Sequence, residues 1–345
     1  MKPAIPRPVL TLRPFVEHNI QLSIVIPFLN ESEVLPICHA RLSRVLEALD
    51  EPYEIVFVDD GSTDGSVEYL IELMRRDRRV RVIKLSRNFG KEAAMSAGLS
   101  EARGSAVILL DADLQDPPEL IPEMMAAWKA GVDVVSMRRR SRSGESWGKR
   151  TSAYLFYRLL SRLSRSPIPA DTGDFRLMSR RAVEALLAMP ERCRYMKGLY
   201  AWIGMPTTVI DYDREPRAAG KTKWSYCALL GLAIEGITSF STAPLRWVTI
   251  GGALVAVGGG IFGLSIVVKA LLFGNDADGY PSLMAMITLL SGMQLVTIGL
   301  LGEYVGKAYM ESKQRPMYVV HEILSGEEET STQPAVEVAA NASVG

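Results

Sequence analysis

The chain has 345 residues, enough for one large domain or two ordinary ones. Its 39 Lys and Arg residues balance its 39 Asp and Glu residues, so the net charge is near zero. This balance excludes a bulk electrostatic attraction to nucleic acid, and we expect no nucleic-acid partner. The cysteines, Cys38, Cys193 and Cys227, form neither a CxxC pair nor a metal-ligand spacing, which favours a reducing compartment over a disulfide framework.

The first residues, 1–20, are rich in proline and contain no continuous apolar run. They predict a flexible lead rather than a signal peptide.

From residue 21 to about residue 206, apolar strand-like segments alternate with helical ones. The predicted strands are Leu22–Pro27, Glu54–Asp59, Val80–Leu85, Ala106–Leu110 and Val132–Met137. The predicted helices between them are Glu31–Leu49, Gly65–Arg76, Lys91–Arg103 and Pro118–Lys129. This order predicts an α/β domain with a largely parallel sheet covered on both faces. Ligands of such sheets bind beyond the carboxyl ends of the strands.

Two later segments, Trp247–Val268 and Ser282–Gly302, contain no charged residue. Each exceeds the roughly 18 apolar residues that indicate a membrane span. They predict transmembrane helices over 246–272 and 282–306, joined by a loop over 273–281. The alternative is a pair of buried core helices, but uncharged runs of this length are uncommon in soluble domains.

Charges around these segments predict the topology. The loop carries Asp276 and Asp278 but no Lys or Arg, although Lys269 just before it is a counter-signal. Basic residues outside the pair are Arg246, Lys307, Lys313 and Arg315. The positive-inside rule then predicts a multi-pass protein of the cytoplasmic membrane, with the α/β domain and both termini in the cytoplasm.

Small residues recur at every fourth position of the first span. They are Gly252, Ala256 and Gly260, and Gly259 and Gly263. Such spacing lets helices approach closely, so we expect packing against the second span or a homo-oligomer formed through these helices. The remaining residues, 307–345, form a predicted cytoplasmic tail whose polar end, from Ser325, is disordered.

The segment Asp111-Ala112-Asp113 directly follows the predicted strand that ends at Leu110. Two carboxylates at a strand end can reach one Mg²⁺ or Mn²⁺ ion, which also binds diphosphate oxygens. Such an ion neutralises charge on a departing nucleoside diphosphate. Gln115 can add an amide oxygen. The alternative is a polar turn that caps the helix beginning at Pro118.

Acidic residues also follow the earlier strands. Asp59 and Asp60 can accept hydrogen bonds from a base N–H or from ribose hydroxyls, although Asp60-Gly61 is equally typical of a tight turn. We expect Asp64 to be a structural N-cap and Asp59 to be functional. Glu31 is a second candidate for binding the base, or a helix N-terminal acid that offsets the dipole.

Several of these motifs resemble the inverting family 2 glycosyltransferases with the GT-A fold. They are PFLNE, VDDGSTDGS, RNFGK at 87–91 and DADLQDPPE. DTGDFRL at 171–177, GKTKW at 220–224, the two apolar spans and Gly302-Glu303-Tyr304 narrow the resemblance. Together they resemble polyprenyl-phosphate glycosyltransferases of the bactoprenol glucosyltransferase type, relatives of dolichyl-phosphate mannose synthase. The resemblance covers about residues 22–318.

The resemblance implies a Rossmann-like GT-A domain over 21–225, an interfacial helix over 226–245 and the membrane anchor. It implies that the nucleotide-sugar contacts Pro27, Glu31, Asp59, Asp60, Lys91, Asp111 and Ala112. It implies that Mg²⁺ or Mn²⁺ and the diphosphate lie among Asp111, Asp113 and Gln115, with Asp113 counted as catalytic.

A carboxylate near the acceptor can serve as a general base in inverting transfer. The segment DTGDFRLM offers Asp171 and Asp174, and the resemblance favours Asp174. A phosphate acceptor is already anionic, so Asp174 can instead orient groups. For Asp171 the alternative is a surface salt bridge to Arg176 or Arg180.

Basic residues form the last signal. A cluster follows the fifth strand: Arg138, Arg139, Arg140, Arg142, Lys149 and Arg150. For most of it, a solvated face or membrane contact explains the charge. The candidate ligands of acceptor or diphosphate oxygens are Arg138, Arg176, Lys221 and Lys223. The helical stretches Ser152–Leu163 and Tyr226–Phe240 fit either the bilayer interface or the core.

The predicted activity is transfer of a sugar, glucose from UDP-glucose by resemblance, to undecaprenyl or a similar polyprenyl phosphate, with inversion at C1. N-acetylhexosamine, galactose and modified arabinose are alternative sugars. A processive polysaccharide synthase would carry a QxxRW motif, which the stretch CRYMKGLYAW lacks, and more spans. A non-catalytic membrane protein that binds nucleotide or partners is the third alternative, and intact Asp111 and Asp113 argue against it.

Overall fold

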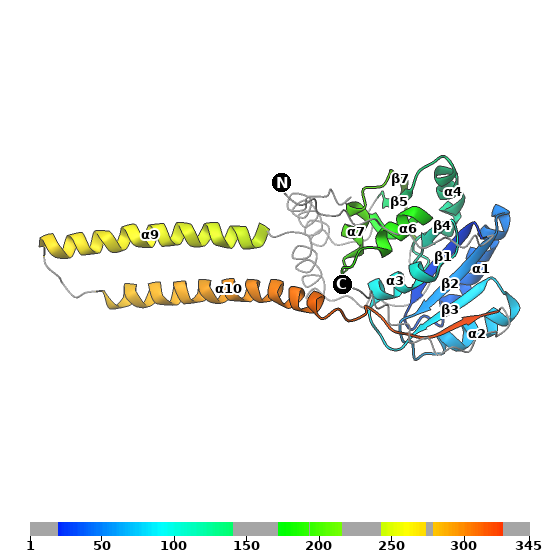
Figure 1. Ribbon diagram of the computed structural model, residues 1–345, viewed down its shortest axis with the longest axis horizontal. Helices are drawn as coiled ribbons and strands as arrows, with labels where there is room; N and C mark the ends of the chain where they lie inside the picture. The colour runs from blue at the N-terminus through cyan, green and yellow to red at the C-terminus, as the bar shows by residue number, and fades with distance from the viewer. Residues whose placement is uncertain (1–19, 141–171, 193, 216–242, 274–278, 327–345) are drawn as a thin grey trace, which may run out of the picture.

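The computed structural model describes residues 20–140, 172–192, 194–215, 243–273 and 279–326 (Figure 1). These residues form an α/β domain and two long helices that extend away from it. The predicted interfacial stretches at Ser152–Leu163 and Tyr226–Phe240 lie outside the described residues.

The α/β domain is built on one eight-stranded sheet in the order β7-β5-β6-β4-β1-β2-β3-β8. The strands are β1 (Leu22–Phe28), β2 (Tyr53–Asp59), β3 (Val80–Leu85), β4 (Ala106–Leu109), β5 (Val134–Arg139), β6 (Thr172–Ser179), β7 (Thr207–Tyr212) and β8 (Val320–Ser325). Only β6 and β8 are antiparallel to their neighbours. The predicted α/β class with a mostly parallel sheet is therefore confirmed.

Helices cover both faces of this sheet. They are α1 (Leu35–Leu49), α2 (Ser66–Arg76), α3 (Lys91–Glu101), η1 (Pro118–Leu120), α4 (Ile121–Lys129), α6 (Arg180–Leu187) and α7 (Met196–Trp202). Alternate residues of each strand enter opposite cores, because successive side chains of a strand point to opposite faces. Ile24 and Ile26 pack with α1, α2 and α4, whereas Val25 packs with α3, α6 and α7.

Helix α3 lies unusually close to the sheet. A Cβ atom placed on Gly98 would lie 2.2 Å from Val25 Cγ1 and 2.9 Å from Val58 Cγ2. Two of the neighbouring inward positions, Ala94 and Ala97, are also small and fully buried. This close packing fixes where α3 begins, at Lys91, beside the carboxyl edge of the sheet.

Beyond the domain, α9 (Ala243–Phe273) and α10 (Tyr280–Ser312) run antiparallel as a long hairpin (Figure 1). Large apolar side chains along both helices are exposed, such as Leu254 and Ile261 on α9 and Leu295 and Val296 on α10. Among the described residues, one segment, Leu289–Ser312, is long and apolar enough to cross a membrane, and a shorter apolar segment covers Trp247–Phe262.

The chain then returns to the α/β domain. Strand β8 pairs with β3 in antiparallel register, from Arg81 opposite Ser325 to Leu85 opposite Val320. The predicted domain range of 21–225 is therefore incomplete, because an edge strand comes from the segment predicted to be a cytoplasmic tail. This strand is short, and of its side chains only Val320 and Leu324 pack against the hydrophobic cores. Its sequence therefore shows only a weak alternation of apolar and polar residues.

Asp64 ties together the loops that follow β1 and β2. Its carboxylate accepts hydrogen bonds from the backbone N–H of Ser32 (3.0 Å) and Ser66 (3.1 Å) and from the Ser66 hydroxyl (2.6 Å). It lies one residue before Gly65, the N-cap of α2, so its predicted structural position is shifted by one residue. Loss of hydration alone would raise the pKa of Asp64, but these hydrogen bonds outweigh that effect and lower the pKa to about 2.

We predict that Asp64→Asn lowers the free energy of unfolding at pH 7 by about 1 kcal/mol, the usual difference between hydrogen bonds to a charged acceptor and to a neutral one. The pKa is lower in the folded chain than the ordinary 3.8, so the carboxylate stabilises the fold above about pH 4 and loses this effect as the pH falls toward about 2. Urea unfolding of the full chain in detergent at several pH values measures the difference. Glu68→Gln, in the first turn of α2, is the control. A difference between Asp64→Asn and the parent that persists unchanged at pH 2 would contradict this account.

Candidate active site

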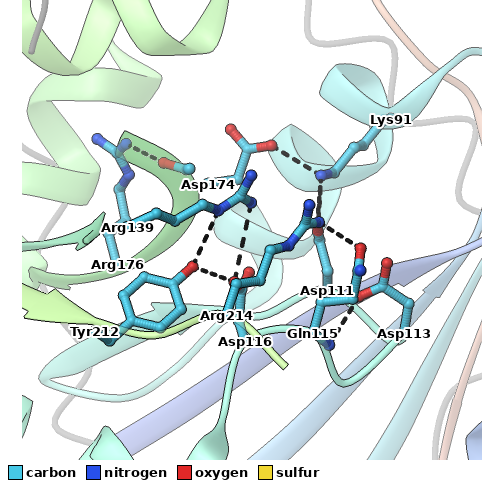
Figure 2. A network of polar contacts seen from close by, with 11 residues as sticks. Lys91, Asp111, Asp113, Gln115, Asp116, Arg139, Asp174, Arg176, Tyr212 and Arg214 are labelled. Atoms are coloured by element: carbon cyan, nitrogen blue, oxygen red, sulfur yellow. Dashed lines mark hydrogen bonds and ion pairs between the residues drawn. The ribbon is translucent and has the colours of Figure 1, made fainter. Parts of the chain in front are cut away.

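The polar residues predicted from the sequence gather at one edge of the sheet. Strands β1, β2 and β4 run parallel, so the loops that follow them meet there. Strand β6 runs in the opposite direction, so its first residues reach the same edge. Asp174 therefore comes close to Asp111, although the two residues are far apart in the sequence (Figure 2).

Lys91 joins these two carboxylates. Its ammonium nitrogen lies 2.7 and 2.9 Å from the two carboxylate oxygens of Asp111 and 2.8 Å from one oxygen of Asp174. The Lys91 side chain is 44% exposed, whereas that of Asp174 is only 16% exposed. Burial alone would raise the pKa of Asp174, but the charges of Lys91 and Lys197 outweigh it and hold the pKa below its usual range. Asp174 is therefore an anion at neutral pH.

Asp60 holds the backbone segment that precedes Lys91. Its two carboxylate oxygens accept hydrogen bonds from the backbone N–H groups of Phe89 (2.7 Å) and Gly90 (2.9 Å), the two residues before Lys91. The Asp60 side chain is buried, and burial raises its pKa. The structure thus places this predicted donor-binding residue inside the protein, where it shapes the loop that presents Lys91.

The other predicted donor-binding residues lie nearby. Asp59 is buried at the end of β2 and accepts a hydrogen bond from Ser62 N–H (2.8 Å), as in a tight turn. Pro27 lies within β1, and Ala112 is buried. The Glu31 backbone N–H donates to the Ser66 hydroxyl (3.1 Å), which joins the loop after β1 to α2.

The loop after β4 carries the predicted metal ligands. One carboxylate oxygen of Asp113 accepts a hydrogen bond from Gln115 N–H (3.2 Å), and the Gln115 side-chain oxygen accepts one from Arg214. Within the described residues, no three His, Cys, Asp or Glu side chains form a ready-made metal cluster. Mg²⁺ is commonly bound by one or two carboxylates plus substrate phosphates. Asp111, which already holds a cationic ammonium group, and Asp113 fit that donor set.

A second network, centred on Asp116, was not predicted from the sequence. Asp116 is fully buried and accepts a hydrogen bond from the Tyr212 hydroxyl, and burial raises the pKa of Asp116. Arg139 Nε donates to the same hydroxyl (3.3 Å), and its Nη2 lies 3.9 Å from Asp116. Burial and the nearby charge of Arg139 lower the pKa of Arg214 (Figure 2). Arg139 and Arg214 are like charges that repel each other, and an anion bound beside both would offset that repulsion.

The structure separates the two neighbouring arginines of β5. Arg138 forms a two-point ion pair with Asp211 of β7 (2.6 and 2.9 Å), whereas Arg139 joins Asp116 and Tyr212. Their side chains point to opposite faces because they are adjacent on a strand. The alternation of side chains between the two faces of β5 is the sequence feature that distinguishes Arg138 from Arg139.

Arg176 lies beneath the site instead of at its surface. It is only 4% exposed, and its Nη2 donates to the Gly173 carbonyl (2.7 Å). Its guanidinium carbon lies 3.4 Å from the centre of the Tyr200 ring, and burial lowers its pKa. In this position Arg176 supports the start of β6, where Asp174 lies, and offers little surface to a lipid phosphate. Asp171, Lys221 and Lys223 lie outside the described residues.

Comparison with known proteins shows the family to which the chain belongs. The profile of Glycosyl transferase family 2 matches residues 23–187. A glycosyltransferase of Synechocystis is 47% identical over 305 residues, which cover 88% of this chain and 96% of that protein. The bactoprenol glucosyl transferase of Shigella phage SfV is 44% identical over 87% of this chain and 98% of its own length. A prophage bactoprenol glucosyl transferase homolog of Escherichia coli is 43% identical over 88% and 99%.

Among solved structures, mannosyl-3-phosphoglycerate synthase from Rubrobacter xylanophilus aligns with a TM-score of 0.46 at 20% identity, covering 68% of this chain and 75% of that one. The relatives above match at higher identity along nearly their whole length. The chain is a glycosyltransferase and belongs to glycosyl transferase family 2.

Proposed function

We propose that this glycosyltransferase moves glucose from UDP-glucose to a polyprenyl phosphate at the cytoplasmic face of a membrane. The observation that carries the proposal is the Lys91 bridge between Asp111 and Asp174, which assembles cation-binding and anion-binding groups at one open edge of the sheet. The named bactoprenol glucosyl transferases, at 43–44% identity, support the sugar and the lipid.

In the proposed reaction, the nucleotide occupies the loops that carry Glu31 and Asp59, and the diphosphate lies at Asp111 and Asp113. Mg²⁺ or Mn²⁺ held by these two carboxylates would neutralise charge on the departing diphosphate. An oxygen of the lipid phosphate forms a bond to C1 of the sugar on the side opposite the breaking bond to the diphosphate. The configuration at C1 inverts, and a β-linked product follows from an α-linked donor.

This reaction removes no proton from the acceptor, because the lipid phosphate is already an anion. The ionised Asp174 therefore acts in our proposal by holding Lys91 at the site rather than as a general base. The Lys91 ammonium group then lies where the charges of the donor and acceptor phosphates meet, and it can stabilise both.

The basic residues that face the site also suit phosphate oxygens. Arg139 and Arg214 converge beside Asp116, and both present planar guanidinium groups. Arg138 and Arg176, the candidates from the sequence, are engaged elsewhere. We retain Lys221 and Lys223 as predicted phosphate ligands.

The long hairpin suits a lipid acceptor. Exposed apolar side chains on α9 and α10 would be unfavourable in water and favourable in a bilayer. We propose that both helices span the cytoplasmic membrane, with the α/β domain and both termini in the cytoplasm, and that small residues of α9 allow a homo-oligomer. The apolar segment of α10 and the names of the relatives support membrane association.

We predict that the purified full chain transfers glucose from UDP-glucose to undecaprenyl phosphate in detergent, with a lipid product heavier by one hexose. The measurement is mass spectrometry of the lipid after incubation with a panel of nucleotide-sugars, including N-acetylhexosamine, galactose and modified arabinose donors. Transfer from another donor of the panel would replace glucose in the proposal. Transfer of many sugars to one lipid would indicate a processive enzyme, and no transfer from any donor would refute the activity.

We predict that Asp113→Ala lowers turnover by about 100-fold or more, because a carboxylate that holds the charge-neutralising ion is lost. EDTA should abolish transfer by the parent enzyme, and Mg²⁺ or Mn²⁺ should restore it. Glu72→Ala, which removes an exposed carboxylate of α2, is the control and should leave turnover unchanged. Full turnover in EDTA would exclude the metal.

We predict that Arg139→Ala lowers kcat/KM for undecaprenyl phosphate by about 10- to 100-fold, the effect of losing a charge-assisted hydrogen bond. Arg138→Ala removes a neighbouring arginine that pairs with Asp211. Because an exposed ion pair contributes little, this variant should change kcat/KM by less than about twofold. Arg139→Lys keeps the charge and should recover part of the loss. Thermal midpoints identify a variant that merely unfolds. Equal effects of Arg138→Ala and Arg139→Ala would overturn the assignment.

A further inference from the structure

The last turn of α10 is fastened to the α/β domain through Arg192, which lies between α6 and α7. The Arg192 backbone N–H donates to both carboxylate oxygens of Glu311 (2.9 and 3.1 Å). Its guanidinium group donates from Nε to the Arg315 carbonyl (2.6 Å) and from Nη2 to the Gln314 carbonyl (3.1 Å). Both carbonyls follow Lys313, the C-cap of α10, and a cation near the C-terminal end of a helix suits the helix dipole. Arg192 therefore holds both the last turn of α10, through Glu311, and the residues just after the helix.

A second attachment follows within a few residues. The Tyr318 hydroxyl lies 2.9 Å from the Ser100 hydroxyl of α3, and Ser86 N–H donates to the Val319 carbonyl (2.9 Å). Strand β8 then continues along β3. Because α10 is held at its last turn and again just beyond it, the helix cannot swing freely about a flexible linker.

The Arg192 segment leads directly to the active site. It continues into α7, whose first residue, Met196, donates its backbone N–H to Glu92 (3.1 Å), the neighbour of Lys91. Tyr200 of α7 stacks on Arg176, two residues after Asp174. Arg192 therefore contacts the end of α10, and α7, a few residues later in the chain, contacts the neighbours of both Lys91 and Asp174.

We propose that Arg192 is a positioning residue that holds α10 at a fixed place relative to the active site, so that a phosphate carried at the membrane surface meets the donor. The inference rests on the proposed function. The acceptor oxygen belongs to a molecule anchored in the bilayer, whereas the sugar is held by the α/β domain. Their approach within reacting distance therefore depends on the joint between domain and anchor. A short, water-soluble acceptor diffuses into the site and does not depend on this joint.

The test compares two acceptors. Arg192→Ala removes the hydrogen bonds to the Gln314 and Arg315 carbonyls, and Glu311→Ala removes the acceptor of the Arg192 backbone N–H. We expect each to lower kcat/KM for undecaprenyl phosphate in lipid vesicles by about tenfold, the scale of a small misplacement of reactants. With a short-chain prenyl phosphate in solution, both variants should keep kcat and KM within about twofold of the parent. Arg76→Ala, which removes an exposed arginine of α2, is the control for both assays.

Two outcomes would overturn the proposal. Equal losses with both acceptors would mean that Arg192 only stabilises the fold. Unchanged kcat/KM in vesicles would mean that the attachment of α10 at Arg192 does not affect transfer to the membrane-bound acceptor.

A second measurement is independent of the reaction. Spin labels at Trp202→Cys and Val305→Cys, both exposed positions, report the distance between α7 and α10 in a background without native cysteines. We expect one narrow distance distribution in the parent and a broad one after Arg192→Ala or Glu311→Ala. If the distribution stays narrow in both variants, Arg192 and Glu311 do not hold α10 in place relative to the α/β domain. If the parent transfers no sugar to polyprenyl phosphate while the variants broaden the distribution, the proposed function fails and the joint stands.

Discussion

The candidate site depends on one cation held between two carboxylates. Asp111 and Asp174 approach the same point from β4 and β6, and two anions brought together without a cation would repel each other. Lys91 offsets that repulsion, so its position determines the site. That position depends in turn on Gly98, which lets α3 lie against the sheet, and on Asp60, which holds the two residues before the helix. Gly98 and the buried Asp60 thus place the ammonium group that joins Asp111 and Asp174.

Charged residues of this site fall into two groups that act differently. Lys91, Asp111 and Asp113 reach solvent at the sheet edge, where a substrate can meet them. Asp60, Asp116 and Arg176 are buried, and each bonds to a backbone group or a side chain of the site instead. An unpaired buried charge is costly, so removing the partner of a buried residue disturbs the structure more than removing an exposed residue. Loss of activity alone therefore does not distinguish a residue that contacts substrate from one that positions it.

The sequence predicts β1 to β5 because these strands are apolar runs that end at turn residues. It also predicts that Asp111 lies near the ends of the neighbouring strands, because parallel strands bring their carboxyl ends together. It does not predict the partners of single arginines. Arg138 and Arg139 differ only in the face of β5 on which they lie. Tyr212 contacts Arg139 because the register of β5 and β7 places the two residues opposite each other. The attachment of α10 to Arg192 joins residues more than a hundred positions apart, and no local pattern indicates it.

The position of β8 also determines the order in which the protein can be completed. Strand β3 is exposed along one edge until the ribosome has made α9, α10 and the residues that follow them. Open edges pair readily with other chains, so the nascent domain is at risk of aggregation during this interval. If the apolar hairpin enters the bilayer first, β8 emerges beside a domain already held at the membrane surface and pairs with β3 of the same chain. Insertion would then precede the pairing of β8 with β3, and this pairing could form only after both helices have been made.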